Sequence, residues 1–506
     1  MPKKCKKWLS FAGLMVSIVC LALPASADEA GEGVIFTFWP LIDYRESPSD
    51  GFSNLGILGP LIKIQSQGDE KVVAVRPLFY REEQAKYSTV TTDYLYPLAS
   101  TDSTPEVSRF QFLKLVQKNA YQKENPESQE RDSMFFPFYI SGTSKKYGPY
   151  TSVFPIYGDI YERFWRDEYH FVLFPLYGRT VKKGTTSRNY LYPFFNTIEG
   201  EKESGFHFWP LYGQSAKEGV YQKRFVLWPF FMQEKSGIDT DNPTEKLILF
   251  PLYSSTDSPD KTARGYLWPF AGYTEDRKKK ETEHDYLWPL IWTVRGEKRQ
   301  VDSYLPFYSH VQRPESSRTW YLWPLFRHDT ISSDQFSQER NRLLFFLYTD
   351  SLESWPKDGT SRRRTALWPL FVYKRDPRGV KSLGIPAPVE PVFDLEGIEK
   401  SWSPLWRLYQ QKWNDSGDSA VSFLWNLYWH EVRGKSLAYE LFPLVSYRGD
   451  EGRNDLSLLK GMIRYRTGPE GNIISLFWLP FGLSWGDPVP VVSTPVAQNV
   501  SRSTLP

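Results

Sequence analysis

The chain has 506 residues, and its 62 basic and 59 acidic side chains leave a net charge of +3 at neutral pH. A chain so close to electrical balance gives no electrostatic basis for binding nucleic acid, so no nucleic-acid partner is expected. Both cysteines, Cys5 and Cys20, precede residue 28. A mature chain that begins there can form neither disulfides nor thiolate metal sites.

Residues 1–27 have the composition of a secretory signal peptide. Four lysines open the chain, an apolar stretch covers residues 8–23, and small residues for cleavage stand at 25–27. The apolar stretch is short for a membrane span. Val19 before Cys20 disfavours lipid attachment at that cysteine. Export without cysteines is typical of bacterial envelope proteins.

After this segment, one short apolar phrase recurs along the chain. Tyr321-Leu322-Trp323-Pro324-Leu325-Phe326 is a clean copy, and residues 190–195, 226–231 and 286–291 repeat it. Between positions 137 and 324 its prolines fall 17 to 22 residues apart. Such a period indicates one small structural unit copied in tandem, about 20 to 22 times when degenerate copies are included.

Each copy is interpreted as a β-strand followed by a turn. In residues 222–235, polar ends bracket an apolar centre from Phe225 to Met232. Aromatic and β-branched residues favour strands, and Ser236-Gly237 gives a turn signal. The predicted fold is all-β: an antiparallel meander of about 20–22 tandem repeats of ~19 residues, one domain over 28–485, closed into a large β-barrel.

The proline inside the phrase conflicts with a central strand position, because proline cannot donate to a β-ladder. Two interpretations remain open. The favoured one places a regular bulge or bend at each proline. The other places two short strands in each repeat.

The solvent that these strands face is inferred from their side chains. If residues 225–232 form one strand, both of its faces are apolar over roughly 20 to 25 Å, close to the apolar band of about 25 Å in outer-membrane barrels. The chain therefore resembles outer-membrane barrels in general. It departs from them in its prolines, in an apolar inner wall and in a Ser/Thr/Pro-rich tail at 486–506, which is expected to be disordered.

No pattern in the chain predicts catalysis, a cofactor or a metal site. The match Gly482-Leu483-Ser484-Trp485-Gly486 lacks the following helix that a nucleophile elbow needs, because Pro488 and Pro490 come next. The acidic run at 281–285 and the basic runs at 277–280 and 362–364 are interpreted as solvated turns, and the basic runs also as lipid-headgroup contacts. The six histidines show no metal-ligand spacing and are expected at apolar–polar boundaries: His170, His207, His284, His310, His328 and His430.

Two segments break the repeat and are predicted as long loops, at about 116–133 and 376–400. They are candidates for contact with a partner or for a plug inside the barrel. Deletion of 378–392 is predicted to leave the array folded.

The resulting hypothesis is a non-enzymatic β-barrel in the outer membrane of a Gram-negative bacterium, acting as a conduit or scaffold for apolar molecules. Its expected partners are membrane lipids, together with apolar small molecules or an envelope protein. The alternative is a soluble periplasmic all-β repeat protein that binds a protein or a glycan. An envelope enzyme with a site built across strands is a third, weaker hypothesis.

Overall fold

The computed structural model describes residues 34–48, 51–113, 115–121, 131–144, 146–389, 396–469, 471–479 and 481–486. The predicted signal peptide, residues 122–130 of the first predicted loop and the predicted tail from residue 487 onward lie outside these residues.

The described residues form 46 strands and a few short helices. The first half contains β1 (Val34–Phe38), β2 (Ile42–Ser47), β3 (Phe52–Ile57), β4 (Ile62–Gln67), β5 (Glu70–Val75), β6 (Phe79–Gln84), β7 (Thr89–Tyr94), β8 (Ala99–Ser103), β9 (Val107–Phe112), β10 (Val116–Tyr121), β11 (Arg131–Phe135), β12 (Tyr139–Ser144), β13 (Gly148–Val153), β14 (Tyr157–Arg163), β15 (Arg166–Val172), β16 (Tyr177–Lys182), β17 (Thr185–Tyr190), β18 (Phe195–Glu199), β19 (Glu203–Phe208), β20 (Tyr212–Lys217), β21 (Tyr221–Val226), β22 (Phe231–Ser236) and β23 (Thr244–Leu249). The second half contains β24 (Tyr253–Asp257), β25 (Lys261–Tyr266), β26 (Ala271–Asp276), β27 (Glu281–Leu287), β28 (Ile291–Gly296), β29 (Gln300–Tyr304), β30 (Tyr308–Arg313), β31 (Ser316–Tyr321), β32 (Phe326–Ser332), β33 (Ser337–Leu343), β34 (Tyr348–Trp355), β35 (Thr360–Leu367), β36 (Phe371–Arg375), β37 (Lys381–Ile385), β38 (Tyr409–Trp413), β39 (Ser419–Phe423), β40 (Tyr428–Arg433), β41 (Ser436–Leu441), β42 (Val445–Asp450), β43 (Arg453–Leu458), β44 (Ile463–Gly468), β45 (Gly471–Leu476) and β46 (Leu483–Trp485). The helices are α2 (Glu396–Ser401) and α3 (Ser403–Trp406), with single 3₁₀ turns η2 (Ala85–Tyr87) and η4 (Leu459–Gly461).

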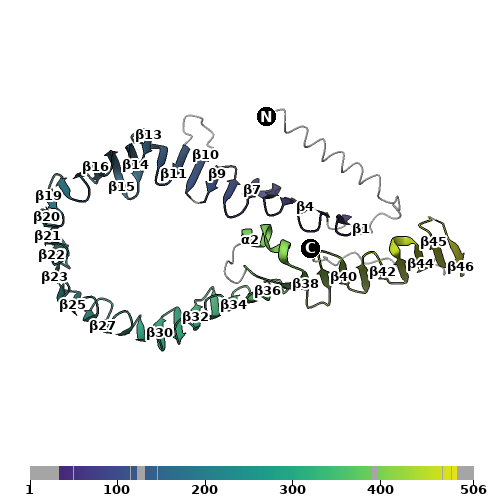
Figure 1. The fold of residues 1–506 in the computed structure, drawn as a ribbon. Coiled ribbons are helices and arrows are strands. Elements are labelled where there is room, and N and C mark those ends of the chain that lie inside the picture. The colour runs from purple at the N-terminus through teal and green to yellow at the C-terminus, as the bar shows by residue number, and fades with distance from the viewer. Residues whose placement is uncertain are drawn as a thin grey trace.

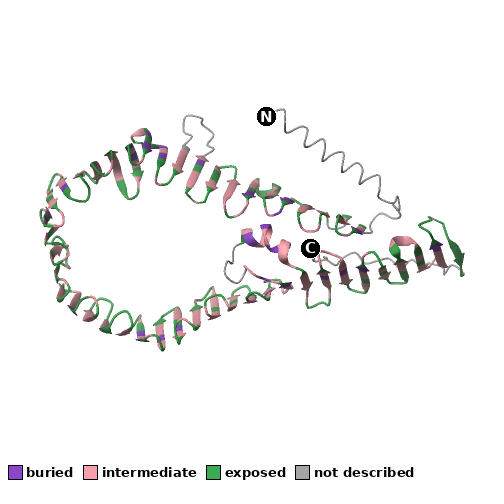
Figure 2. Ribbon diagram, viewed as in Figure 1, coloured by how far each residue is buried: buried purple, intermediate pink, exposed green. Residues whose placement is uncertain are grey.

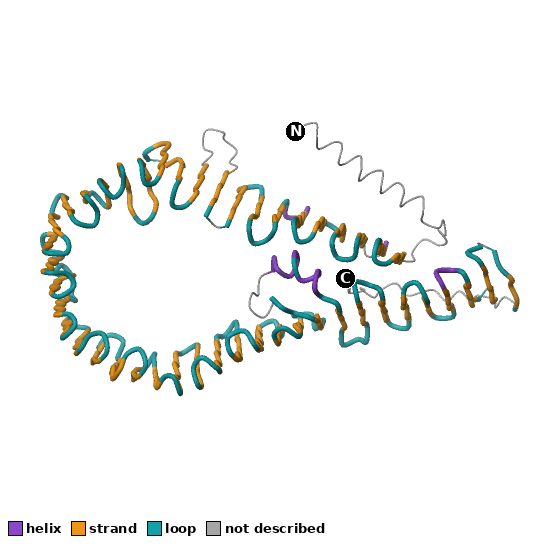
Figure 3. The backbone as a smooth tube through the Cα atoms, viewed as in Figure 1, coloured by secondary structure: helices purple, strands orange, loops and turns teal. Residues whose placement is uncertain are grey.

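Every strand pairs antiparallel with the next strand in the chain, so the sheet is one continuous meander. This confirms the predicted all-β antiparallel repeat. The sheet forms a single curved ribbon whose strands run between two edges, with turns along each edge (Figure 3). Among the described strands, β1 pairs only with β2 and β46 only with β45, so this ladder does not join its two ends.

The favoured interpretation of the proline is wrong, because each repeat contains two strands and the apolar phrase is the turn between them. In the clean copy, Tyr321 ends β31, residues 322–325 form the turn, and Phe326 begins β32. The polar segments that were predicted as linkers contain most of each strand. A turn position also removes the conflict with the ladder, because a turn proline has no ladder partner to lose.

The predicted strand with two apolar faces is also wrong. Of residues 225–232, Phe225 and Val226 end β21, Phe231 and Met232 begin β22, and a turn separates the pairs. The apolar side chains therefore concentrate along one edge of the ribbon and do not fill the middle of each strand. We call this edge, formed by the turns that follow the odd-numbered strands, the apolar rim.

The ribbon bends back on itself, and its two ends lie side by side (Figure 1). The indole Nε1 of Trp39 donates a hydrogen bond to the Leu424 carbonyl oxygen at 2.8 Å, and the Asn426 amide donates to the Asp43 carboxylate at 2.9 Å. Arg45 forms an ion pair with Glu431. We call this face-to-face contact between β1–β7 and β38–β44 the neck.

Antiparallel partners share a face, so the strand register shows which side chains line the neck. Thr37, Asp43, Gly56, Lys63 and Ala74 are successive partners across β1 to β5. Because Asp43 contacts the opposite end of the ribbon, the whole row faces the inside of the bend. Thr37 and Ala74 are almost fully buried there, whereas most of the ribbon is a single layer with partly exposed residues on both faces (Figure 2).

The second predicted loop, 376–400, is wrong in part, because it includes β37 and α2. The first, about 116–133, likewise includes β10 and the start of β11. Deletion of 378–392 would therefore remove a strand that pairs with both β36 and β38. The deletion is no longer expected to spare the fold.

The helices α2 and α3 follow β37 on the apolar-rim side and lie inside the bend, against β5–β7 (Figure 1). The Arg76 guanidinium donates to the Lys400 carbonyl at 2.8 Å, and the Lys400 ammonium contacts Glu82 at 2.7 Å. The Trp402 indole donates to the Tyr96 carbonyl at 2.6 Å. These bonds attach the helices to the first strands. In the portion of the chain that the structure describes, no helix has the length and apolarity to cross a lipid bilayer.

Candidate functional site

The apolar rim runs along one edge of the ribbon through the turns that follow the odd-numbered strands. Its turns present leucine, tryptophan and phenylalanine side chains that stay substantially exposed. In one turn, Leu227 is 54% exposed, Trp228 is 45% exposed and Phe230 is 59% exposed. A contiguous exposed apolar surface marks a site that contacts another apolar phase or partner.

The local conformation of the turn explains its residue order. The leucine that opens the turn has a positive φ, as in Leu191 (50°), Leu227 (45°) and Leu322 (49°). The aromatic–proline bond that follows is cis, and Phe230 N–H closes the turn on the Leu227 carbonyl at 2.8 Å. A leucine in the left-handed region is disfavoured by its Cβ. Leucine stands at this position despite that cost, and its side chain stays about half exposed on the rim.

Hydrogen bonds also link successive turns along the rim. Leu227 N–H donates to the Leu211 carbonyl, and Trp228 N–H donates to the Pro210 carbonyl, each at 2.7 Å. The same pair of bonds joins Leu191 and Tyr192 to Leu176 and Pro175, at 2.8 and 2.7 Å. These bonds satisfy turn N–H groups that would otherwise need water. The rim can consequently enter an apolar medium at a lower cost than an ordinary loop.

A belt of rings lies next to the rim on the outer face of the ribbon. Tyr190, Phe195, Phe208 and Tyr212 are successive partners in this row, and the rings of Phe195 and Phe208 stack with centroids 4.8 Å apart.

The belt is one residue deep over the middle of the ribbon. The next outward-facing row is mostly polar, with Phe206 and Leu247 as exceptions, and tyrosine hydroxyls of the belt reach it. Tyr212 donates to Gln214 at 2.8 Å, and Tyr157 donates to Asp159 at 2.9 Å. The apolar zone thus consists of the turns and one row of strand residues.

The opposite edge of the ribbon carries charged turns with ion pairs. Lys280 contacts Glu297 at 2.9 Å and Lys235 contacts Glu245 at 2.7 Å. The basic run 277–280 forms one of these turns, as predicted. The run 362–364 instead lies within β35, where Arg363 contacts Asp350 at 3.0 Å.

The structure places the six histidines on both faces of the ribbon. Five histidines lie in the polar row beside the belt, and His207 lies on the inner face. Among the described residues, no three His, Cys, Asp or Glu side chains are grouped as metal ligands would be. Ser484 lies within β46 and not at a strand–helix turn.

The acidic run 281–285 is also not a turn, because it lies in β27. Burial, with the neighbouring Glu283 carboxylate, raises the pKa of Asp285 to about 6. One oxygen of its carboxylate is buried without a hydrogen-bond partner among the described residues.

The neck residues were not identified from the sequence. Arg45 and Glu431 are separated by more than 380 residues, and neither stands in a recognisable motif. Only the fold brings them together. Comparison with protein-family models and with curated proteins finds no match to either. The fold itself defines the protein as an all-β tandem-repeat ribbon with one apolar edge and one charged edge.

Proposed function

We propose that the protein is a non-enzymatic scaffold of the bacterial cell envelope that lies on the outer membrane through its apolar rim. The observation that carries the proposal is the concentration of exposed leucine and aromatic side chains along one edge. The turns of the other edge are mostly charged, and Tyr87, Phe164 and Trp165 are exposed aromatic exceptions there. A ribbon with these two edges is stable at an interface between lipid and water, because the apolar rim then faces lipid and the charged edge faces water.

Strand length favours a surface position over a membrane span. Most strands have five to seven residues, whereas a tilted membrane-spanning strand needs about 9 to 11. The apolar zone comprises only the turn and one adjacent row, because the next row contains Arg188, Gln214 and Arg224 in the middle of the ribbon. Its depth suits the roughly 5 to 10 Å by which interfacial elements enter the headgroup boundary.

The inner face is chemically mixed. Its row nearest the rim has polar or charged members and large apolar members: Asn196, Ser303, Ser309, Arg327 and Arg342 among the first, and Phe225, Met232, Ile248, Trp292 and Trp320 among the second. Because polar and charged side chains interrupt the apolar ones, the row offers no unbroken apolar path, and a scaffold fits it better than a conduit for apolar molecules.

Flotation with phosphatidylcholine vesicles tests the proposal on the chain from residue 28 onward. The test variant carries Leu252→Glu, Phe307→Glu and Leu370→Glu, which place charges on three rim turns whose side chains are 57–70% exposed. The matched control carries Gln312→Glu, Gln335→Glu and Ser416→Glu on the charged side. Wild type and control should float, and the test variant should lose at least about tenfold in partitioning. A wild-type chain that stays with the buffer, and is released from cells by osmotic shock, would support a soluble periplasmic binding module instead.

A further inference from the structure

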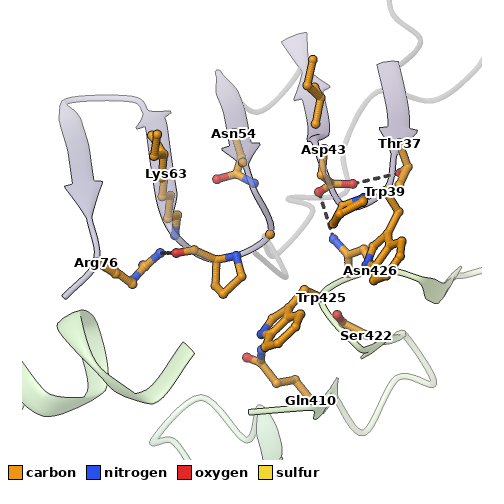
Figure 4. A pocket seen from close by; sticks show the side chains of 16 residues that line it. Thr37, Trp39, Asp43, Asn54, Lys63, Arg76, Gln410, Ser422, Trp425 and Asn426 are labelled. Carbon is orange, nitrogen blue, oxygen red and sulfur yellow. Dashed lines mark hydrogen bonds between the residues drawn. The ribbon is translucent and has the colours of Figure 1, made fainter. Parts of the chain in front are cut away.

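A cavity in the neck lies between the two ends of the ribbon. Its volume is about 150 Å³, which is comparable to cavities that admit a benzene-sized molecule. Lys63, Asn54 and Arg76 line it from the first strands, and Gln410 and Trp425 line it from the C-terminal part of the chain. Figure 4 shows these two groups of side chains facing each other across the cavity.

The cations at this cavity lack acidic partners. Neither Lys63 nor Arg76 forms an ion pair within the described chain, and Arg76 uses its guanidinium on the carbonyls of Lys400 and Pro60, at 2.8 and 2.9 Å. Lys412 is two residues after Gln410 in β38, so it lies on the same inward face one row farther from the rim, behind the residues that line the cavity. It acts electrostatically on Lys63 and likewise has no ion pair among the described residues. Three cations that lie close together, with no carboxylate in ion-pair contact, raise the free energy of the neck, and a bound anion would lower it.

Burial and neighbouring cations together lower the pKa of both lysines. Burial, with the neighbouring Arg76 and Lys412, lowers the pKa of Lys63 to about 8. Burial, with the neighbouring Arg407, lowers the pKa of Lys412 to about 8. The other charged groups that act on the two lysines are Glu70, Asp376 and Lys374.

The polar lining supplies hydrogen-bonding groups as well as charge. The Asn54 carboxamide oxygen is buried without a partner, and a half-turn of that amide would present its N–H₂ group to the same space. The one carboxylate that lines the cavity, Asp43, already accepts hydrogen bonds from Thr37 at 2.9 Å and Asn426 at 2.9 Å. An anion would therefore meet donors and cations, with the nearest carboxylate engaged elsewhere.

We propose that the neck cavity binds a phosphate group, held by Lys63 and Lys412 with Asn54 and Gln410 as hydrogen-bond donors. Lys63 is the second residue of β4, directly after a rim turn. A rim that rests in a bilayer would hold this cavity near the depth of lipid headgroups, and this part of the argument rests on the proposed function. The phosphate could belong to a lipid headgroup or be free in solution, and both present the same chemistry.

The first measurement uses inorganic phosphate on the chain from residue 28 onward, with chloride at matched ionic strength as the reference. Phosphate should raise the melting temperature of wild type and broaden its own phosphorus NMR signal at pH 7. Lys63→Met/Lys412→Met should lose at least about tenfold in phosphate affinity. Lys278→Met/Lys435→Met removes the same charge from exposed positions and should bind phosphate as wild type does.

A phosphate-binding role and a purely structural role for the lysines predict opposite changes in the melting temperature of the phosphate-free protein. Removal of unpaired buried cations should raise its melting temperature, whereas loss of a structural contact should lower it. If the double variant does not fold, Lys63→Met alone should show the same two changes. At pH 9.5, above the lowered pKa of both lysines, phosphate should stabilise wild type far less than at pH 7.

Vesicles distinguish the two sources of phosphate. Phosphatidylcholine vesicles with one-tenth phosphatidic acid should compete with inorganic phosphate in the NMR measurement if the ligand is a lipid headgroup. Failure of that competition, with binding of free phosphate retained, assigns the cavity to a soluble phosphate. Absence of any phosphate effect in wild type, or an equal effect in the double variant, would overturn the proposal. On pure phosphatidylcholine, Lys63→Met/Lys412→Met should still float, because the rim supplies most of the attachment and the other vesicle lipid, phosphatidic acid, is absent. Failure of wild type and this variant alike to float would count against the rim proposal and leave the phosphate measurement to decide on the cavity.

Discussion

Trp39 and Leu424 are 385 residues apart in the chain, yet the indole of one donates a hydrogen bond to the carbonyl of the other at 2.8 Å. Both belong to rim turns, so the apolar rims of the two ribbon ends meet at the same level. Arg45 adds two contacts to the neck. Its guanidinium lies 4.8 Å from the ring centre of Trp429 and also forms an ion pair with Glu431. The bend is thus held by polar contacts between two sheet faces.

The first prediction concerns this neck. Arg45→Met with Asn426→Ala leaves Glu431 with only its 3.4 Å ion pair to Arg433 and removes the Asn426–Asp43 hydrogen bond. The neck should weaken by about 2 kcal/mol, which is less than when a buried charge loses every partner. Fluorescent labels at Asp69→Cys and Ser416→Cys would report the separation of the two ends by energy transfer, because the chain after residue 27 has no other cysteine. The variant should lower the transfer efficiency.

The matched control for the neck is Arg264→Met, which removes an ion pair with Asp257 from the middle of the ribbon. It should leave energy transfer between the two ends unchanged. Equal transfer in all three proteins would show that the contacts at Arg45 and Asn426 do not hold the bend.

The second prediction concerns the depth of the rim in a bilayer. Tryptophans such as Trp228, Trp268 and Trp323 stand in rim turns. Their fluorescence should shift to the blue on vesicle binding. It should be quenched most by lipids brominated near the headgroup, because the apolar zone suits an insertion of only about 5 to 10 Å. Strongest quenching by bromine at the chain ends would indicate a rim near the bilayer centre and contradict a surface position.

The third prediction separates the folding and binding roles of the positive-φ leucine that opens several rim turns. Leu227 has a φ of 45°, a region that costs a non-glycine residue about 1 to 2 kcal/mol. Leu227→Gly should therefore keep or slightly raise the melting temperature while weakening flotation. Leu227→Val should lower the melting temperature, because a β-branched side chain fits this region worse.

The same substitutions made together at Leu191, Leu227 and Leu322 should add, because the three turns are not neighbours and share no partner. A melting temperature that falls with each glycine would show that the leucines stabilise the turn itself. Their role in lipid binding would then lose its support.

The tandem repeat, the all-β class and the antiparallel meander could all be predicted from the sequence, because each rests on local patterns. The prediction was wrong about which part of the repeat forms the strand. A phrase such as Val226 to Phe231 is rich in strand-forming residues, and propensity alone places it in a strand. The register of hydrogen bonds decides otherwise, since the proline and the left-handed leucine fit a turn.

The neck and its cavity had no signal in the sequence. Lys63 follows a rim turn like many other polar residues, and nothing near it in the chain distinguishes it from Lys217 or Lys235. Its distinctive surroundings are built by residues of β38 and the turn after β39, which come some 350 positions later. Contacts at such separation depend on the accumulated curvature of the whole ribbon, which no local pattern specifies.

The last prediction concerns Asp285 in β27, whose pKa burial raises to about 6. In the unfolded chain its pKa is near 3.8, so between these values the folded state binds more protons than the unfolded state. Stability therefore falls as the pH rises from about 4 to 6, and the full penalty is present at pH 7. A shift of this size corresponds to about 3 kcal/mol at most, and about 1 kcal/mol is expected because water still reaches the site.

Asp285→Asn keeps the shape of the side chain and removes its charge, so it should raise the free energy of unfolding by about 1 kcal/mol at pH 7.5. The gain should shrink at pH 5, where the folded wild-type protein already holds a proton on this carboxyl group. Urea denaturation at the two pH values measures both effects. Asp257→Asn is the control, because Asp257 is half exposed and pairs with Arg264 at 2.7 Å. It should give no gain at either pH. A gain from Asp285→Asn that is equal at both pH values would mean that the amide improves packing, and that burial of charge is not the cause.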